Sequence, residues 1–211
     1  KESLTIKPEG LTITVRSREG RTWGSAPRPV VSVPEPRTAS LPVASPDRHG
    51  TPLLVLFGSN LGAAEDLATR IARDAGDRGY AARTAALDDA VGELPTEGAV
   101  VVVTSSYNGE PPDNAGKFCA WLDGAAGSGD GASATGVRYT VFGCGNRDWA
   151  ATYQAVPTRV DAGLEARGAT RVYPRGEGDA RGDFDAQFAD WYRGLWDALG
   201  AHVRTYDTPN G

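Results

Sequence analysis

The sequence predicts an α/β domain with a doubly wound parallel sheet and helices on both faces. Three apolar runs, at residues 53–57, 99–104 and 137–142, show the unbroken hydrophobicity that is typical of strands buried on both faces. A stretch with helical spacing of apolar residues follows each run. Because strands that alternate with helices are joined by right-handed crossovers, these two observations together predict parallel strands in one sheet.

The first 50 residues differ in composition from the rest of the chain. In residues 1–24, apolar and polar residues alternate around Lys7-Pro8-Glu9-Gly10, which predicts a β-hairpin. Six prolines crowd residues 27–46, and because proline removes donors and fixes φ, residues 25–50 are expected to form an extended linker. The chain contains no Met, so we expect it to begin inside a longer polypeptide, with the hairpin ending a preceding domain.

The packed domain is expected at residues 51–200, and residues 201–211 are expected to start a second linker. We expect strands at 53–57, 99–104 and 137–142, a weaker edge strand at 81–87 and a short strand at 169–173. Helices are expected after the first strand, from about 113 to 126 with Asp113 as the N-cap, at 156–166, and at the end of the domain. The apolar face of the first helix carries Ala64, Leu67, Ala68, Ile71, Ala72 and Ala75, and that of the last helix carries Phe184, Phe188, Trp191, Tyr192, Leu195, Trp196 and Leu199.

Composition excludes several classes of protein. No run approaches the roughly 20 apolar residues of a membrane helix, and two Cys with two His argue against a structural zinc site, a haem-attachment motif or a disulfide framework. The net charge of −5 argues against a nucleic-acid binder. Residues 1–50 carry +3 and residues 51–211 carry −8, so the acidic body is expected to attract basic partner surfaces, less strongly as salt rises.

Three loops follow the three strong strands, and ligands bind at this carboxyl edge of a doubly wound sheet. Residues 58–65 are small or polar and suit a phosphate held by neutral donors, but taken alone this loop favours a plain N-cap turn with Ser59 or Asn60 as the cap. Residues 105–114 carry Tyr107, which alone could equally be a surface residue on a loop. Residues 143–153 carry Trp149, and a single Trp on a loop is more often a partial core plug. Together the loops predict a slot for a phosphorylated planar ring, which flavin mononucleotide (FMN) fits. Cys144 is expected to be inert.

The stretches GSNLGAAEDLA, VVVTSSYNGEPPDNAGKF and RYTVFGCGNRDWAATYQAVP closely resemble the flavodoxin-like FMN domain of diflavin reductases. Residues 1–24 resemble the end of a bacterial fatty-acid hydroxylase haem domain. The joint resemblance is to a self-sufficient bacterial cytochrome P450/NADPH–P450 reductase fusion. It implies a flavodoxin-like five-stranded sheet of order 2-1-3-4-5 over residues 51–200.

The resemblance also implies a site, with the flavin phosphate on residues 59–64 and the ring between Tyr107 and Trp149. Relatives often carry a hydroxyl residue where this chain has Ala63, so its phosphate turn has one donor fewer. No catalytic and no metal-binding residue is implied. The implied cofactor-binding residues are Ser59, Asn60, Leu61, Gly62, Ala63, Ala64, Ser106, Tyr107, Asn108, Gly109, Glu110, Cys144, Gly145, Asn146, Arg147, Trp149, Tyr153 and Gln154.

The function implied is that of an oxidoreductase domain in electron transport. FMN in this chain would relay electrons singly from an NADPH/FAD reductase domain to the haem of a monooxygenase domain, both in the same cytoplasmic polypeptide. No membrane or nucleic-acid partner is implied, and a homodimer of the full enzyme stays open. Six nearby carboxylates are expected to lower the flavin potential: Glu110, Asp113, Asp148, Glu177, Asp179 and Asp183. For Glu177 and Asp179, a role in partner docking and plain solvation are equally favoured.

Three other functions are less compatible with the sequence. A free-standing flavodoxin carrier is disfavoured by the hairpin and the Pro-rich linker. A cofactor-free signalling receiver needs an acidic cluster where this chain has Gly58-Ser59 and Thr104-Ser105. A nucleotide hydrolase is disfavoured because the first loop lacks the P-loop Lys.

Overall fold

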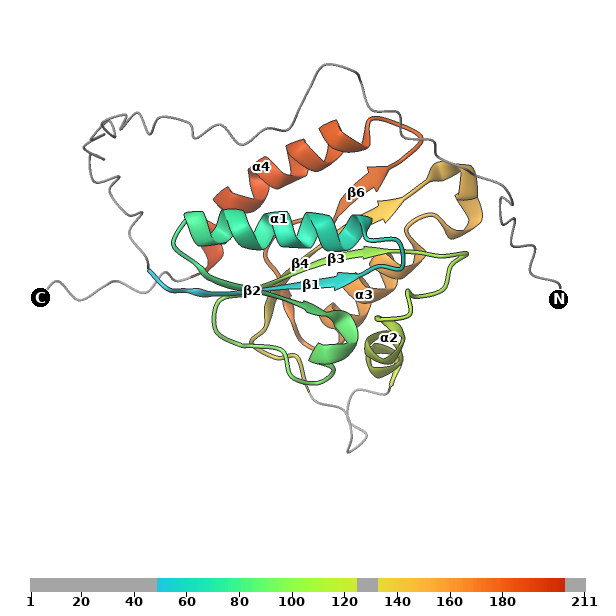
Figure 1. Ribbon diagram of the computed structural model, residues 1–211. Coiled ribbons are helices and arrows are strands. Elements are labelled where there is room, and N and C mark those ends of the chain that lie inside the picture. The colour runs from blue at the N-terminus through green and yellow to red at the C-terminus, as the bar shows by residue number, and fades with distance from the viewer. Residues whose placement is uncertain (1–48, 125–132, 204–211) are drawn as a thin grey trace, which may run out of the picture. The chain divides into compact units, whose positions relative to one another are not determined.

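A computed structural model of the chain describes residues 49–124 and 133–203 (Figure 1). The predicted hairpin, most of the predicted linker and residues 204–211 lie outside these ranges. The strands are β1 (Pro52–Gly58), β2 (Ala81–Ala86), β3 (Ala99–Ser105), β4 (Arg138–Gly145), β5 (Thr170–Arg171) and β6 (Gly176–Asp179). The helices are α1 (Ala63–Asp77), α2 (Gly116–Asp123), α3 (Ala155–Ala166) and α4 (Phe184–His202), with 3₁₀ turns η1 (Leu87–Ala90) and η2 (Arg147–Thr152).

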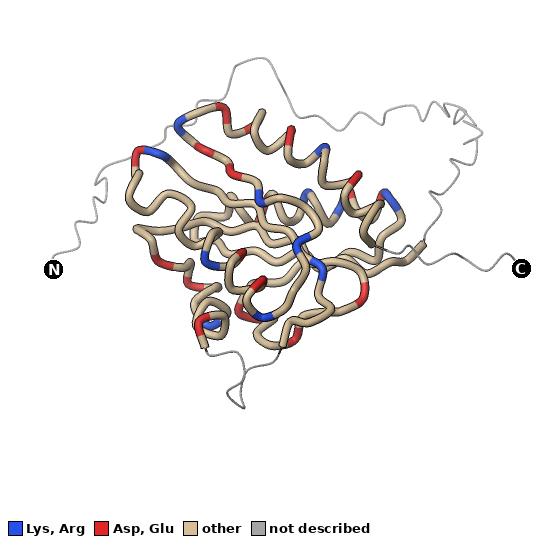
Figure 2. Tube along the Cα trace, turned by 180° about the vertical axis from the view of Figure 1, so that it is seen from behind, with Lys and Arg blue, Asp and Glu red and all other residues tan. Residues whose placement is uncertain are grey.

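The sheet is parallel and has the order β2-β1-β3-β4-β5, with β6 also paired to β4. Helices α1 and α4 cover one face and α2 and α3 the other (Figure 1). Every residue of β3 is buried, and β1 and β3 carry no charged residue, as expected for strands covered on both sides. Figure 2 shows the charged positions mainly on helices and loops around a largely uncharged group of central strands. The predicted fold class and strand order are confirmed.

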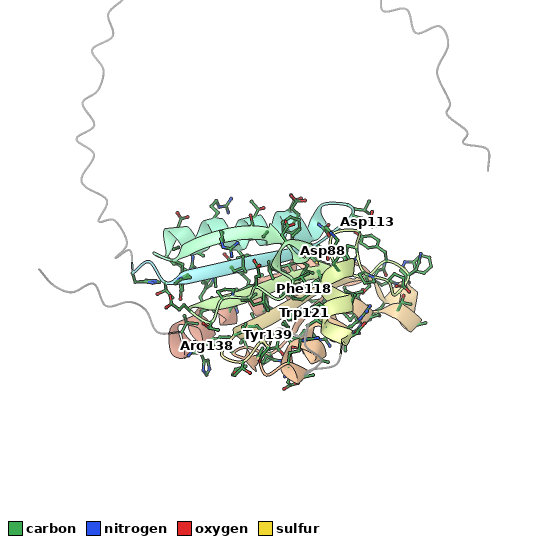
Figure 3. The ribbon with its side chains drawn as sticks, turned by 90° about the horizontal axis from the view of Figure 1, so that it is seen from below. Asp88, Asp113, Phe118, Trp121, Arg138 and Tyr139 are labelled. Carbon is green, nitrogen blue, oxygen red and sulfur yellow. The ribbon has the colours of Figure 1, made fainter. Side chains whose placement is uncertain are left out.

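Side chains of the central strands alternate between two cores. Leu53 and Val55 join Ile71 of α1 and the aromatic face of α4 in one core. Leu54 and Leu56 join the other core, beneath α2 and α3, where Phe118 and Tyr139 are fully buried (Figure 3). This alternation fixes the register of β1 because a shift of one residue would exchange the two sets of side chains.

The fifth sheet position differs from the prediction because two short strands share it. Strand β5 pairs with β4 up to Tyr139–Arg171, and β6 pairs with β4 from Phe142–Gly176 onward. Three residues along β4 therefore correspond to five residues along the edge segment, which contains two extra residues. Pro174 lies in the interruption and has no N–H to donate. The glycines of β6 are needed because aromatic rings pack on its backbone: a Cβ on Gly176 would lie 2.5 Å from carbon atoms of the Phe142 and Trp191 rings.

Helix α2 is shorter than predicted, and Asp113 is not its N-cap. The N-cap residue is Ala115, and no side-chain hydrogen bond caps the helix at that position. Instead Asp88 of η1 reaches the first turn, where its Oδ1 accepts the backbone N–H of Phe118 at 2.9 Å (Figure 3). The preference of Asp for N-caps is therefore overridden by a contact from a distant part of the chain.

Among the described residues, no helix combines the length and the hydrophobicity that crossing a bilayer requires.

Candidate functional site

A cavity of about 550 Å³ opens at the carboxyl edge of the sheet. Its walls come from the segments that follow β1, β3, β4 and β6, as the switch point of a doubly wound sheet predicts. No residue that lines it is charged, in the part of the chain that the structure describes. The lining residues are Leu61, Ala63, Ser105, Ser106, Tyr107, Asn108, Cys144, Gly145, Asn146, Trp149, Thr152, Tyr153, Gln154, Ala180 and Phe184.

The turn after β1 is tied to the loop after β3 by reciprocal hydrogen bonds. The backbone N–H of Ser59 donates to Asn114 Oδ1 at 3.0 Å, and the N–H of Asp113 donates to Asn60 Oδ1 at 2.8 Å. The N-cap of α1 is Gly62, with no side-chain cap, so neither Ser59 nor Asn60 is the cap residue. The side chain of Asn60 is used to join the two loops rather than to start the helix.

Tyr107 stands at the end of β3 and contacts both loops. The backbone N–H groups of Asn60 and Leu61 donate to its hydroxyl oxygen at 3.1 and 3.3 Å. Its own backbone N–H and C=O exchange hydrogen bonds with Glu110 at 3.0 and 2.9 Å, which closes a two-residue turn at Asn108-Gly109. The ring is thus fixed at its hydroxyl end and at its backbone.

Two residues of the cavity wall adopt backbone conformations that L side chains rarely take. They are Asn108, with φ of 54°, and Gln154, with φ of 58°, and they are the non-glycine residues with positive φ among those described. Positive φ at Asn108 is usual for a two-residue Asn-Gly turn. Gln154 would be relaxed by glycine, so its side chain is expected to serve a purpose at this site.

Gln154 connects the segment after β4 with β6. Its Nε2 donates to the carbonyl oxygens of Gly143 at 3.0 Å and of Gly178 at 3.4 Å, while its Oε1 is buried without a hydrogen-bond partner. The hydroxyl of Tyr153 is likewise buried and unpartnered. Two polar atoms in the wall are therefore available to a ligand that carries hydrogen-bonding groups.

Trp149 is exposed, as expected for an aromatic residue on this loop. Its side chain is 67% exposed, and Leu61, at 84%, is the other exposed large apolar residue on the described surface. Both line the cavity. An apolar ring that is not packed in a core is suited to stacking on a flat ligand.

The carboxylates expected around the site have different environments. Asp179 is 6% exposed, so the interpretation of this residue as a docking or solvated carboxylate is wrong. Burial works to raise its pKa, but hydrogen bonds from the backbone N–H groups of Arg147 and Arg181 and the charges of both side chains outweigh burial and lower it. Asp148 pairs with Arg181 at the surface, and Glu177 pairs with Arg175 at 2.8 Å.

Eleven of the 18 implied cofactor-binding residues line the cavity: Leu61, Ala63, Ser106, Tyr107, Asn108, Cys144, Gly145, Asn146, Trp149, Tyr153 and Gln154. Seven do not: Ser59, Asn60, Gly62, Ala64, Gly109, Glu110 and Arg147. Sequence reasoning missed Ser105, Thr152, Ala180 and Phe184. The first two adjoin predicted residues, whereas Ala180 and Phe184 follow β6, which the sequence pattern did not reveal.

Both cysteines are expected to resist modification in the folded protein. Burial raises the pKa of Cys144 to about 12, against a smaller opposite effect of a Ser105 hydrogen bond, and burial raises the pKa of Cys119 to about 11. Because the thiolate is the nucleophile, reaction with a disulfide reagent at pH 8 should be very slow when folded and fast in denaturant. Rapid labelling of folded protein at pH 8 would show that at least one of the two thiols is not buried as described.

The sequence model of the flavodoxin family matches residues 55–191. The chain belongs to the flavodoxin family. Domains of this family bind FMN and work in electron transfer, and the cavity fits that cofactor because its lining is uncharged and aromatic, with two unpartnered polar atoms. The resemblance stated from the sequence is confirmed.

Two curated relatives are multidomain enzymes. "Bifunctional cytochrome P450/NADPH--P450 reductase 2" of Bacillus subtilis (strain 168) is 45% identical over 93% of this chain, and "Bifunctional cytochrome P450/NADPH--P450 reductase" of Bacillus cereus is 39% identical over 95%. The chain spans 18% and 19% of their lengths. Homologues of this flavodoxin domain are therefore parts of oxidoreductase fusions.

Solved structures support the fold. A point mutant of a flavodoxin from Pseudomonas aeruginosa has a TM-score of 0.56 at 25% identity and covers 71% of this chain and 99% of its own. "Oxidised Flavodoxin 1 from Bacillus cereus" has a TM-score of 0.59 at 18% identity and covers 73% of this chain and 100% of its own. The second likeness, at that identity, concerns the fold alone.

Proposed function

We propose that this chain is the FMN-binding electron-relay domain of a haem–reductase fusion. The observation that carries the proposal is the uncharged cavity, which Tyr107 and Trp149 line from separate loops at the carboxyl ends of the strands. Because the relatives are multidomain enzymes, a domain of a fusion is favoured over a free-standing carrier. The proposed partners are the haem domain and the FAD/NADPH reductase domain of the same cytoplasmic polypeptide, without a membrane or nucleic-acid partner.

Each wall of the cavity has a proposed role. The first turn of α1 would hold the phosphate, because the first N–H groups of a helix lack intrahelical partners and favour an anion. The N–H groups of residues 59–61 already donate to side chains of the loop after β3. Tyr107 and Trp149 would contact the two faces of the ring, and Tyr153 and Gln154 its polar edge. When bound, FMN supplies the redox chemistry, taking up two electrons and releasing them singly.

The charges around the cavity would make reduction less favourable. The described lining offers no cation to stabilise a negatively charged ring, and residues 51–211 carry a net charge of −8. The exposed side chain of Trp149 would keep one wall of the site at the surface, where a haem domain could approach.

Titration of flavin-free protein with FMN and with riboflavin tests the proposal. We expect FMN to bind more tightly, because riboflavin lacks the phosphate that the helix N-terminus favours. The reduced FMN-loaded protein should then reduce a ferric haem domain taken from a related fusion. A protein that stays colourless and leaves the fluorescence of added FMN unchanged would refute FMN binding, and bound FMN that never delivers an electron to haem would refute the relay.

A further inference from the structure

The position of Trp149 depends on its backbone, because its ring is mostly outside the core. The side chain is 67% exposed, and the backbone angles of φ −100° and ψ 53° interrupt the 3₁₀ turn η2. An exposed indole gains little from packing, so contacts of the preceding residues must determine where it lies. The backbone N–H of Trp149 donates to the carbonyl of Asn146 at 3.1 Å, and the N–H of Asp148 donates to Asn146 Oδ1 at 2.9 Å.

One buried carboxylate holds this turn. Asp179 Oδ1 accepts the backbone N–H of Arg147 at 3.0 Å and that of Arg181 at 3.0 Å, and Asp179 Oδ2 lies 3.5 Å from Arg147 Nε. The carboxylate therefore joins the segment after β4 to the segment after β6. Charge-assisted hydrogen bonds to backbone N–H groups are stronger than neutral ones, and the near-complete burial of Asp179 protects them from competing water.

Asp179 is itself held in place from three directions. It pairs with Gly145 across β6 and β4, its backbone N–H donates to Gln187 Oε1 of α4 at 2.7 Å, and its carbonyl accepts the N–H of Gly182 at 2.9 Å. The next residue, Ala180, lines the cavity and donates its N–H to the carbonyl of Gly145 at 2.8 Å. The carboxylate is thus a fixed point between the sheet, α4 and the cavity.

Arg147, the ion-pair partner of Asp179, also contacts Tyr153 of the cavity wall. The guanidinium carbon of Arg147 lies 5.0 Å from the centroid of the Tyr153 ring, within the range of a cation–π contact. Asp179 pairs with that same guanidinium. Two aromatic residues of the wall, Trp149 and Tyr153, are therefore connected to one carboxylate through Arg147.

We propose that Asp179 is a positioning residue that fixes the Trp149 turn at the wall of the cavity and so sets where the indole meets a flavin. The flavin part rests on the proposed function, whereas the positioning of the turn does not. The role is distinct from partner docking because a buried carboxylate with backbone donors is not presented to a partner. It is also distinct from stacking, because Asp179 itself is not among the residues that line the cavity.

Hydrogen exchange of protein without added flavin tests the positioning directly. In Asp179→Ala, backbone amides of residues 146–152 should exchange at least about tenfold faster than in the wild type, because charge-assisted bonds are lost, with Asp179→Asn intermediate. Asp185→Asn is the control, since it removes an exposed carboxylate near Asp179 in sequence, and it should leave the exchange of residues 146–152 unchanged. Equal exchange in folded Asp179→Ala and wild type would overturn the proposal.

A double-mutant cycle tests whether Asp179 acts through Trp149. We expect Asp179→Asn to weaken FMN binding about tenfold in the wild type, but less than about twofold in a Trp149→Ala background. A loss of equal size in both backgrounds would show a general structural effect and refute the link. If the wild type itself binds no FMN, the proposed function fails, while the exchange measurement still decides the positioning role.

Discussion

Replacement of Trp149 by Ala should weaken FMN binding about 5- to 150-fold. This range corresponds to the roughly 1–3 kcal/mol that stacking of a planar ring on an aromatic side chain contributes. The expected effect falls on binding and not on folding, because the indole is 67% exposed and its removal leaves no core cavity. The dissociation constant should be measured by quenching of flavin fluorescence, and the free energy of unfolding by urea titration.

Two further variants make that result specific. Trp149→Phe keeps a flat ring at the same position and should retain most of the affinity. Trp121→Phe changes an indole on α2 that packs against Phe118 and Arg167, away from the cavity lining, and should leave FMN binding unchanged. An unaltered dissociation constant in Trp149→Ala would remove this residue from the binding site.

Replacement of Gly143 by Ala should lower the free energy of unfolding by about 1–3 kcal/mol, the usual range for overpacking. A Cβ at this position would collide with Gln154 Oε1 and lie 2.7 Å from Cβ and Cγ of Pro157. Pro157 is buried and its ring is rigid, so relief of the clash must come from movement of Gln154 toward the cavity that it lines. Displacement of Gln154 would also break its hydrogen bonds to Gly143 and Gly178, and FMN binding should weaken as well.

Gly76→Ala is the matched control for this substitution. Gly76 lies in α1, and a Cβ there would meet nothing within 4 Å. Because Ala is preferred over Gly inside a helix by about 0.5–1 kcal/mol, this variant should be as stable as the wild type or more stable. Equal urea midpoints for the wild type and Gly143→Ala would show that Gln154 is not packed against Gly143.

The central part of the fold could be predicted because its signals are local. The unbroken apolar runs at β1 and β3 indicate burial on both sides whatever the rest of the chain does. Strand β6 could not be predicted, because its sequence Gly-Glu-Gly-Asp has low strand propensity. Its two glycines allow aromatic rings to pack directly on the strand backbone. The start of α2 was misplaced for a similar reason, since Asp88 lies far from it in sequence.

The candidate site shows the same division. Tyr107 and Trp149 could be expected near a ligand because two aromatic residues on loops that converge on one edge of the sheet suit a flat ring, and both line the cavity. Ala180 and Phe184 could not, since they enter the cavity only through the unrecognised β6. The role of Asp179 was misjudged because exposure was assumed for an acidic residue, and its two backbone donors come from a loop about 30 residues earlier and from its own turn.

The cavity walls come from segments between Leu61 and Phe184 that meet only when the parallel strands have paired. Such pairing forms contacts of large sequence separation, which are slow to assemble. The cofactor therefore cannot act as an early folding template, and holoprotein formation should wait for the finished sheet. FMN at a hundredfold excess over its Kd would add about 2.7 kcal/mol to the free energy of unfolding, and so raise thermal and proteolytic resistance.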